Sequence, residues 1–220
     1  MTAGSNDLWP LLWQSLGETL YMVSFALLFG GVAGLLLGLA LYTTRAGGLF
    51  AHRGVNAVLN VLVNIVRPIP FIIFLTAIQP LTIAVSGTSY GPRSMIFPMS
   101  LMATFATSRL VEQNLVSLDP GVVEAARAMG AGRMRIIATV IVPEALGPLI
   151  LGYTFLFVGI VDMSAMGSAV SSGGLGSFAI QYGYNRFNYV VTWVTVAVIV
   201  VLVQLGQLLG NTLARRVLRR

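Results

Sequence analysis

The sequence predicts an all-α integral membrane protein with five transmembrane helices and a pair of short cytoplasmic helices between the third and the fourth. Hydrophobic residues make up 56% of the 220 residues and charged residues only 9%, a balance typical of membrane proteins. Several apolar runs reach the roughly 20 residues that a bilayer requires. The 13 basic residues, all of them Arg, lie mostly between these runs and at the C-terminus. This distribution fits membrane topology better than a nucleic-acid-binding patch.

We expect one transmembrane domain over residues 1–220, with spans at about 19–42, 58–83, 95–111, 145–168 and 189–209. The first span contains Gly34 and Gly38, a pair of small residues suited to close helix packing. No basic residue precedes this span, so the start of the chain lacks the positive region of a signal peptide. The loop that follows holds Arg45 and Arg53. The positive-inside rule therefore places this loop in the cytoplasm and the N-terminus outside.

The second span is too long for one straight helix and should bend near its middle. Pro68 and Pro70 each remove a backbone hydrogen-bond donor, so the bend is expected beside Arg67. Polar residues also recur along this segment at helical spacing, and they should face the bundle interior, an interface or a second copy of the chain, because lipid cannot satisfy them. This polar stripe consists of Asn56, Asn60, Asn64 and Arg67.

The third span leads into a long polar segment at about 119–143. Asp119 followed by Pro120 is typical of a helix start. Apolar residues then share one helical face, and the glycines around Gly130 interrupt it, so we expect two short helices that meet at a bend. Such a face favours docking on another protein, with a solvated surface loop as the alternative. The face consists of Val122, Ala125, Ala126 and Met129.

The last two spans frame a glycine-rich stretch. The fourth span contains Asp162, which we expect to be buried, and an ionisable residue within a span is a functional candidate. We expect Asp162 to be protonated, to pair with Arg67 or Arg186, or to contact a polar part of a pathway. The alternative is a position near the outer interface, where water reaches the carboxylate. Four arginines follow the fifth span and place the C-terminus in the cytoplasm: Arg215, Arg216, Arg219 and Arg220.

The polar segment carries a recognisable spacing. Glu124-Ala125-Ala126 is followed after three residues by Gly130, and after nine more by Val140-Ile141-Val142-Pro143. This resembles the Glu-Ala-Ala loop of bacterial ABC importer permeases, with Val140 and Val142 in place of Ile and Leu. The resemblance implies that the segment docks on a cytoplasmic ATPase through Glu124, Ala125, Ala126, Gly130 and Pro143.

Three further motifs resemble the methionine importer permeases within that family. They are Arg67-Pro68-Ile69-Pro70-Phe71, Ser164-Ala165-Met166 with the run Ser171-Ser172-Gly173-Gly174-Leu175-Gly176, and the stretch 179–187. Their order makes the match more specific than any one of them. The chain departs from the family at Asp162-Met163, where the family has Gly-Tyr, and at Ser171-Ser172, where it has two glycines.

The resemblance implies the permease of an ATP-driven importer in the bacterial inner membrane that carries an amino acid, with methionine expected. It implies a homodimer with two ATPase subunits below and a periplasmic or lipid-anchored substrate-binding protein above. A pathway and gate are expected at Asp162, Ser164, Ala165 and Met166, and structural roles at Arg67, Pro68, Pro70, Gly173, Gly174 and Gly176.

The residues also limit the chemistry. The chain has no Lys, so it lacks the lysine of a phosphate-binding loop, and ATP and Mg²⁺ are expected on the partner. No Cys and a single His, His52, argue against a metal site and a disulfide framework. We therefore expect no cofactor and no catalysis in this chain. The alternative is a stand-alone secondary transporter or channel that uses Asp162, and the alternative for Met166 is a place in the hydrophobic core.

Overall fold

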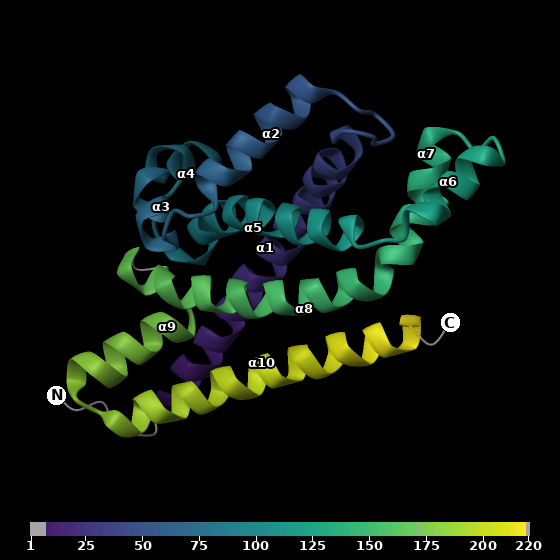
Figure 1. Cartoon of the computed structure of the whole chain (residues 1–220). Coiled ribbons are helices and arrows are strands. Elements are labelled where there is room, and N and C mark those ends of the chain that lie inside the picture. The colour runs from purple at the N-terminus through teal and green to yellow at the C-terminus, as the bar shows by residue number, and fades with distance from the viewer. Residues whose placement is uncertain (1–7, 171, 219–220) are drawn as a thin grey trace.

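The structure is a computed structural model that describes residues 8–170 and 172–218. Residues 1–7, Ser171, Arg219 and Arg220 lie outside the described residues, and with them part of the glycine-rich run and of the basic tail. The described part of the chain is built from helices (Figure 1). They are α1 (Leu8–Thr44), α2 (Arg53–Val66), α3 (Phe71–Ala77), α4 (Gln79–Ser86), α5 (Gly91–Val116), α6 (Pro120–Ala128), α7 (Arg133–Ile136), α8 (Val142–Met166), α9 (Gly174–Phe178) and α10 (Tyr189–Leu218), with short 3₁₀ and π-helical turns between them.

Helices α1 and α5 run in the same direction and pack closely along a row of glycines. A Cβ atom added at Gly30 would lie 2.6 Å from the Cβ of Ala103, and one added at Gly34 would lie 2.8 Å from the carbonyl oxygen of Thr104. Gly38 meets Ser108 in the same way one turn further on. The prediction that Gly34 and Gly38 support close helix packing is therefore confirmed.

Helix α8 runs opposite to α5, and α10 runs opposite to α8. Gly152 of α8 lies against Leu110 of α5, and Gly167, in the turn after α8, lies against Met95. Contacts further along α8 thus meet earlier positions of α5, so the two helices run in opposite directions. Between α8 and α10 the same reversal appears, where Gly147 lies against Leu218 and Gly206 against Phe157. The core between α1, α3, α5 and α8 is filled by methionine and branched side chains, among them Met22, Met95, Met99 and Ile160.

The second predicted span is divided into three helices. The chain bends by 104° between α2 and α3, at the turn that contains Arg67, Pro68 and Pro70. A second interruption at Ile78 separates α3 from α4. The prolines explain the first bend because neither can donate the backbone hydrogen bond that would continue α2. Sequence reasoning placed this bend correctly and missed the break at Ile78.

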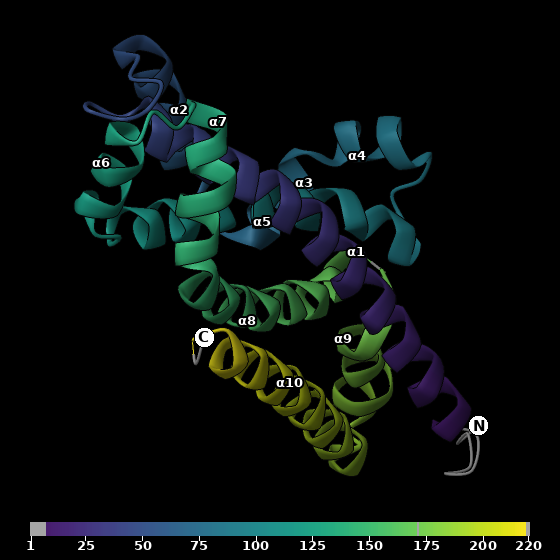
Figure 2. The same cartoon turned by 90° about the vertical axis from the view of Figure 1, so that its right-hand side faces the viewer.

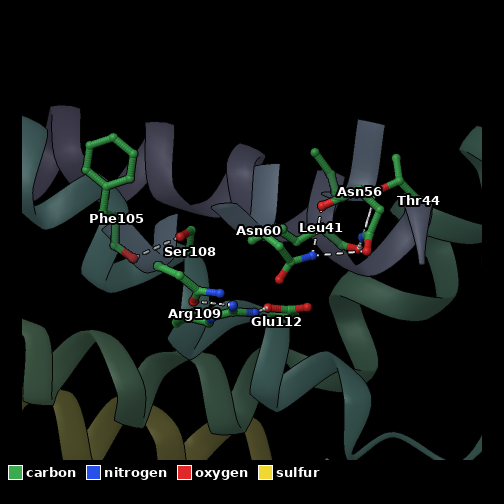
Figure 3. A network of polar contacts seen from close by, with 10 residues as sticks. Leu41, Thr44, Asn56, Asn60, Phe105, Ser108, Arg109 and Glu112 are labelled. Atoms are coloured by element: carbon green, nitrogen blue, oxygen red, sulfur yellow. Dashed lines mark hydrogen bonds and ion pairs between the residues drawn. The ribbon is translucent and has the colours of Figure 1, made fainter. Parts of the chain in front are cut away.

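Part of the polar stripe on α2 ties this helix to α1 and α5 (Figure 3). The amide of Asn56 donates to the carbonyl oxygen of Leu41 at 3.0 Å and to the hydroxyl of Thr44 at 3.1 Å. Arg109 of α5 donates to the side-chain oxygen of Asn64 at 2.7 Å and forms an ion pair with Glu112. The stripe therefore faces the neighbouring helices at these positions, as expected for polar groups in a membrane protein.

Helix α7 continues into α8 without a break. The π-helical turn Ile137–Ile141 joins them, and the combined helix turns a corner there (Figure 1). Pro143 follows this turn as the second residue of α8 and cannot donate to the carbonyl four residues before it. The wider π-helical turn accommodates this loss. The predicted boundary of the polar segment at 143 therefore falls inside a continuous helix.

Three helical stretches are long and apolar enough to cross a membrane: Leu8–Thr44, Arg133–Val170 and Tyr189–Leu218. The bent pair of α2 and α3 makes a fourth if it is counted as one span. Helix α5 occupies the third predicted span but carries Arg93, Arg109 and Glu112 and is not among these candidates. Helix α1 begins at Leu8, well before the predicted start near residue 19.

Candidate functional site

Helices α6 and α7 project from one end of the bundle (Figure 1). The side chain of Asp119 accepts a hydrogen bond of 2.8 Å from the backbone N–H of Gly121, so it caps α6 as predicted. Gly130 follows α6 with a φ of +77°, a conformation that glycine adopts without strain and that turns the chain toward α7. The predicted first short helix and the bend are therefore present, whereas the second is the beginning of the long helix that continues through α8.

The exposed surface of this pair is partly apolar. The side chains of Met129 and Met134 are 81% and 71% exposed. Glu124 and Ala125 are also exposed. Arginines surround these residues, since Arg127, Arg133 and Arg135 are exposed as well. We call the exposed residues of α6, of α7 and of the turn between them the tip surface. It offers two flexible thioether side chains, which adapt readily to a partner, within a rim of positive charge.

Ala126 does not share this exposure. Its side chain is only 3% exposed and packs in a cluster with Leu115, Ile136 and Ile141. The prediction that Ala125 and Ala126 form one exposed face is wrong for this reason: consecutive residues of a helix point about 100° apart. Ala125 faces outward, and Ala126 holds α6 against α5 and α7.

From Leu151 onward, helix α8 has an exposed face, which we call the α8 stripe. Its residues recur every three or four positions, as expected for one side of a helix, and Phe155 is 75% exposed. The opposite side of α8 is buried through Leu156 and Ile160. A Cβ atom added at Gly159 would meet nothing within 4 Å, so the stripe is indented there. The stripe consists of Leu151, Phe155, Gly159, Asp162 and Met166.

Asp162 lies on this stripe and is exposed on the surface of the single chain. The expectation that the chain itself buries Asp162 is wrong, and no ion pair with Arg67 or Arg186 forms within residues 8–170 and 172–218. Arg67 is exposed at the bend after α2, and the Arg186 guanidinium instead lies 4.9 Å from the centre of the Tyr182 ring. An exposed carboxylate on an apolar helix requires water, a cation or a polar partner beside it.

The predicted gate residues separate in the structure. Met166 is 38% exposed and lies one turn after Asp162 on the α8 stripe. Ser164 is buried, and its hydroxyl donates to the carbonyl oxygen of Val161 at 2.6 Å. Ala165 lies against the glycine-rich segment, because a Cβ atom at Gly176 would come within 2.5 Å of the Ala165 Cα. Ser164 and Ala165 therefore hold the helix in place, and Met166 faces outward.

The glycine-rich segment is anchored to α1. Gly173 and Gly174 have φ angles of +82° and +76°. The carboxylate of Glu18 accepts from the backbone N–H of Gly174 at 2.7 Å, and the hydroxyl of Thr19 accepts from that of Leu175 at 2.9 Å. These bonds satisfy free donors at the start of α9. Sequence reasoning missed both acceptors, because nothing local connects them to residues 156 positions away.

The described residues contain no group of three or more His, Cys, Asp or Glu side chains that is arranged to hold a metal ion. Pro68 and Pro70 are exposed in the turn after α2. The candidate site thus consists of the exposed tip surface, the α8 stripe with its one acid, and the glycine-rich segment that packs against the end of α8.

A family model described as the inner membrane component of binding-protein-dependent transport systems matches residues 30–220. The chain belongs to this family. Among curated relatives, a probable D-methionine transport system permease of Vibrio cholerae is 40% identical and covers 94% of this chain and 92% of its own length. A methionine import system permease of Bacillus subtilis is 37% identical, and the match covers 95% of this chain and 94% of the relative.

Solved structures agree with this family. The MetNI methionine ABC transporter in inward-facing conformations contains a chain that is 39% identical, with a TM-score of 0.94 over 97% of this chain and 99% of that one. A crystal structure of an amino acid ABC transporter contains a chain that is only 19% identical and shares the fold, with a TM-score of 0.78.

Proposed function

We propose that this chain is the membrane permease of an ATP-driven importer that carries methionine into the cytoplasm. One observation carries this proposal: relatives named as methionine permeases match nearly the full length at about 40% identity. The chain acts in this proposal as the conduit, and a partner subunit binds and hydrolyses ATP. The described residues and the sequence offer no phosphate-binding loop, which is consistent with that division.

We infer five spans with the N-terminus outside and the C-terminus in the cytoplasm, at about 19–42, 58–83, 95–111, 145–168 and 189–209. The directions of the helices support this topology. Helices α1 and α5 run the same way, and α8 runs opposite to both α5 and α10. The bent pair of α2 and α3 supplies the second span. Arg45, Arg53 and the arginines of the tip surface then lie on one side of the membrane.

We propose that the tip surface docks on the ATPase subunit, as a coupling-helix pair between the third and fourth spans. The exposure of Met129, Met134, Glu124 and Ala125 supports this role. Gly130 supplies the bend between the two helices, and Pro143 lies where the pair joins α8. Ala126 supports the docking element from inside, by packing α6 onto the rest of the chain.

We propose that the α8 stripe lines the translocation pathway, between two copies of the permease. A periplasmic or lipid-anchored binding protein would deliver the substrate from above. The exposed acid supports this placement, because Asp162 requires a polar environment and the pathway is where water enters a transporter. Met166, on the same stripe, would then form a flexible constriction. A transporter that works alone is not our proposal, because the tip surface would have no use in it.

Reconstitution tests this function. The permease, its ATPase and its binding protein are placed in vesicles, and ATP-dependent accumulation of labelled methionine is measured against other labelled amino acids. Accumulation of methionine above the others, and its persistence when a proton gradient is dissipated, is the expected result. Accumulation without the ATPase, or its loss with the proton gradient, would favour the stand-alone transporter instead.

A further inference from the structure

A cavity of about 460 Å³ lies between α1, α4 and the start of α5, away from the α8 stripe. Its volume falls in the range of about 300–1,000 Å³ that is common for small-molecule sites. None of its lining residues belongs to α8. The proposed pathway and this cavity are therefore different parts of the molecule. Its lining includes Tyr21, Phe29, Arg93, Ile96, Phe97 and Ser100.

One end of the cavity carries a positive charge. Arg93 is exposed, lies in the first turn of α5, and forms no ion pair within residues 8–170 and 172–218. The lining contains no acidic side chain. An arginine guanidinium is well suited to bind a phosphate group because it presents several N–H donors in a fixed plane. The cavity thus favours an anion at the Arg93 end.

The walls beyond Arg93 are apolar and aromatic. On α1, Tyr21 and Phe25 have ring centres 5.0 Å apart, and Phe25 and Phe29 have ring centres 5.9 Å apart. Tyr21 and Phe29 of this row line one wall, and Ile96 and Phe97 of α5 line the other. Aromatic side chains near a charged group are typical of the membrane–water interface. The walls suit a hydrocarbon chain below the anion.

The cavity continues along α5 beyond Arg93. Ser100 also lines it and is seven residues after Arg93, which corresponds to about 10 Å along the helix. The acyl chains of a phospholipid extend away from its phosphate in the same way.

We propose that this cavity binds an anionic phospholipid, with its phosphate against Arg93 and an acyl chain between the apolar walls of α1 and α5. Basic pockets between membrane helices bind lipid headgroups in this way. A zwitterionic headgroup is less suited, because the cavity offers no acid to pair with its ammonium group. The lipid fills the gap between α1, α4 and α5.

Native mass spectrometry of the permease–ATPase complex tests the proposal, with phosphatidylglycerol and phosphatidylcholine of identical acyl chains supplied in detergent. We expect preferential retention of phosphatidylglycerol. Arg93→Gln should lower that retention by about fivefold, in keeping with the effect of one basic residue on an anionic lipid. Arg93→Lys should keep at least half of it, which separates the loss of charge from a folding defect. Arg53→Gln, at an exposed arginine of α2, is the matched control and should change nothing.

Two outcomes would overturn the proposal: equal retention in the Arg93→Gln and Arg53→Gln proteins, and equal retention of the two lipids by the parent. A thermal-unfolding measurement separates a lipid from a free anion. Phosphatidylglycerol should raise the unfolding midpoint of the parent, and inorganic phosphate at the same concentration should not. Arg93→Gln should reduce the rise that phosphatidylglycerol produces. An equal effect of inorganic phosphate, or an unchanged rise in Arg93→Gln, would contradict the binding of a lipid at this cavity.

Discussion

The carboxylate of Glu18 accepts a 2.7 Å hydrogen bond from the backbone N–H of Gly174, which lies 156 residues later in the chain. The neighbouring Thr19 hydroxyl accepts from the backbone N–H of Leu175 at 2.9 Å. Both bonds hold the start of α9 on α1, at a point where Gly173 and Gly174 adopt positive φ angles. The proposed gate at Met166 lies just before this segment. The position of the gate is therefore linked to the first helix of the chain.

Replacing Thr19 with Val should destabilise the protein. Thr19 is only 2% exposed, and Val has nearly the same shape but no hydrogen-bond acceptor. The N–H of Leu175 would lose its partner, at a cost of about 1–3 kcal/mol. Thermal unfolding of the purified complex measures this effect. Thr19→Ser keeps the hydroxyl and is the control, and a Val variant as stable as the parent would contradict the role of this bond.

Replacing Gly34 with Ala should disturb the packing of α1 on α5. The added Cβ would lie 2.8 Å from the carbonyl oxygen of Thr104, and overpacking of this kind costs about 1–3 kcal/mol. We expect a lower unfolding midpoint and a lower yield of the assembled complex. Gly17→Ala is the matched control, since nothing lies within 4 Å of a Cβ atom there. Equal effects of the two substitutions would argue against close packing at Gly34.

Replacing Ala125 and Ala126 separately should distinguish docking from folding. Arg at the exposed position 125 should reduce copurification of the ATPase by tenfold or more, because a bulky cation is placed in the proposed interface, and should leave the stability of the permease alone unchanged. Arg at position 126 should lower that stability, because it buries a charge among apolar side chains. Copurification and thermal unfolding are measured together. Normal ATPase binding by Ala125→Arg would remove α6 from the proposed interface.

Replacing Met166 with Ala should leave assembly intact and increase leakage of substrate or ATP hydrolysis without transport. The side chain lies on the α8 stripe and is 38% exposed, so its removal widens the proposed constriction and takes little from the core. Met99→Ala, at a methionine with 0% exposure, is the comparison and should instead lower stability by about 2–5 kcal/mol. A Met166→Ala protein that leaks no more substrate than the parent, and hydrolyses no more ATP per substrate transported, would show that Met166 is not a gate.

Local chemistry explains which features could be predicted from the sequence. The cap of Asp119 on α6, the turn at Gly130 and the bend beside Pro68 depend on residues next to one another. The packing of Gly34 and Gly38 was also accessible, because the spacing of small residues marks a helix contact. Apolar content alone indicated a membrane protein.

Other features depend on contacts that no local pattern specifies. The sequence could not show that Ala126 faces inward while Ala125 faces outward, because that depends on where α6 lies against Leu115 and Ile136. It could not show that Asp162 is exposed, because an apolar run does not reveal which side of the helix packs against the chain. The sequence also could not show that Glu18 and Thr19 accept hydrogen bonds from the backbone of α9, because they lie 156 residues earlier in the chain.

The unbroken helix from α7 through the π-helical turn into α8 has a mechanical consequence. Its 38 residues turn a corner (Figure 2), yet backbone hydrogen bonding continues around it, so the two arms cannot swing freely of each other. In the proposed function this helix is a rigid lever: a displacement of α7 at Arg133 by a docked ATPase would move α8, and Met166 with it. Coupling between ATP hydrolysis and the proposed gate would then require no hinge within this helix.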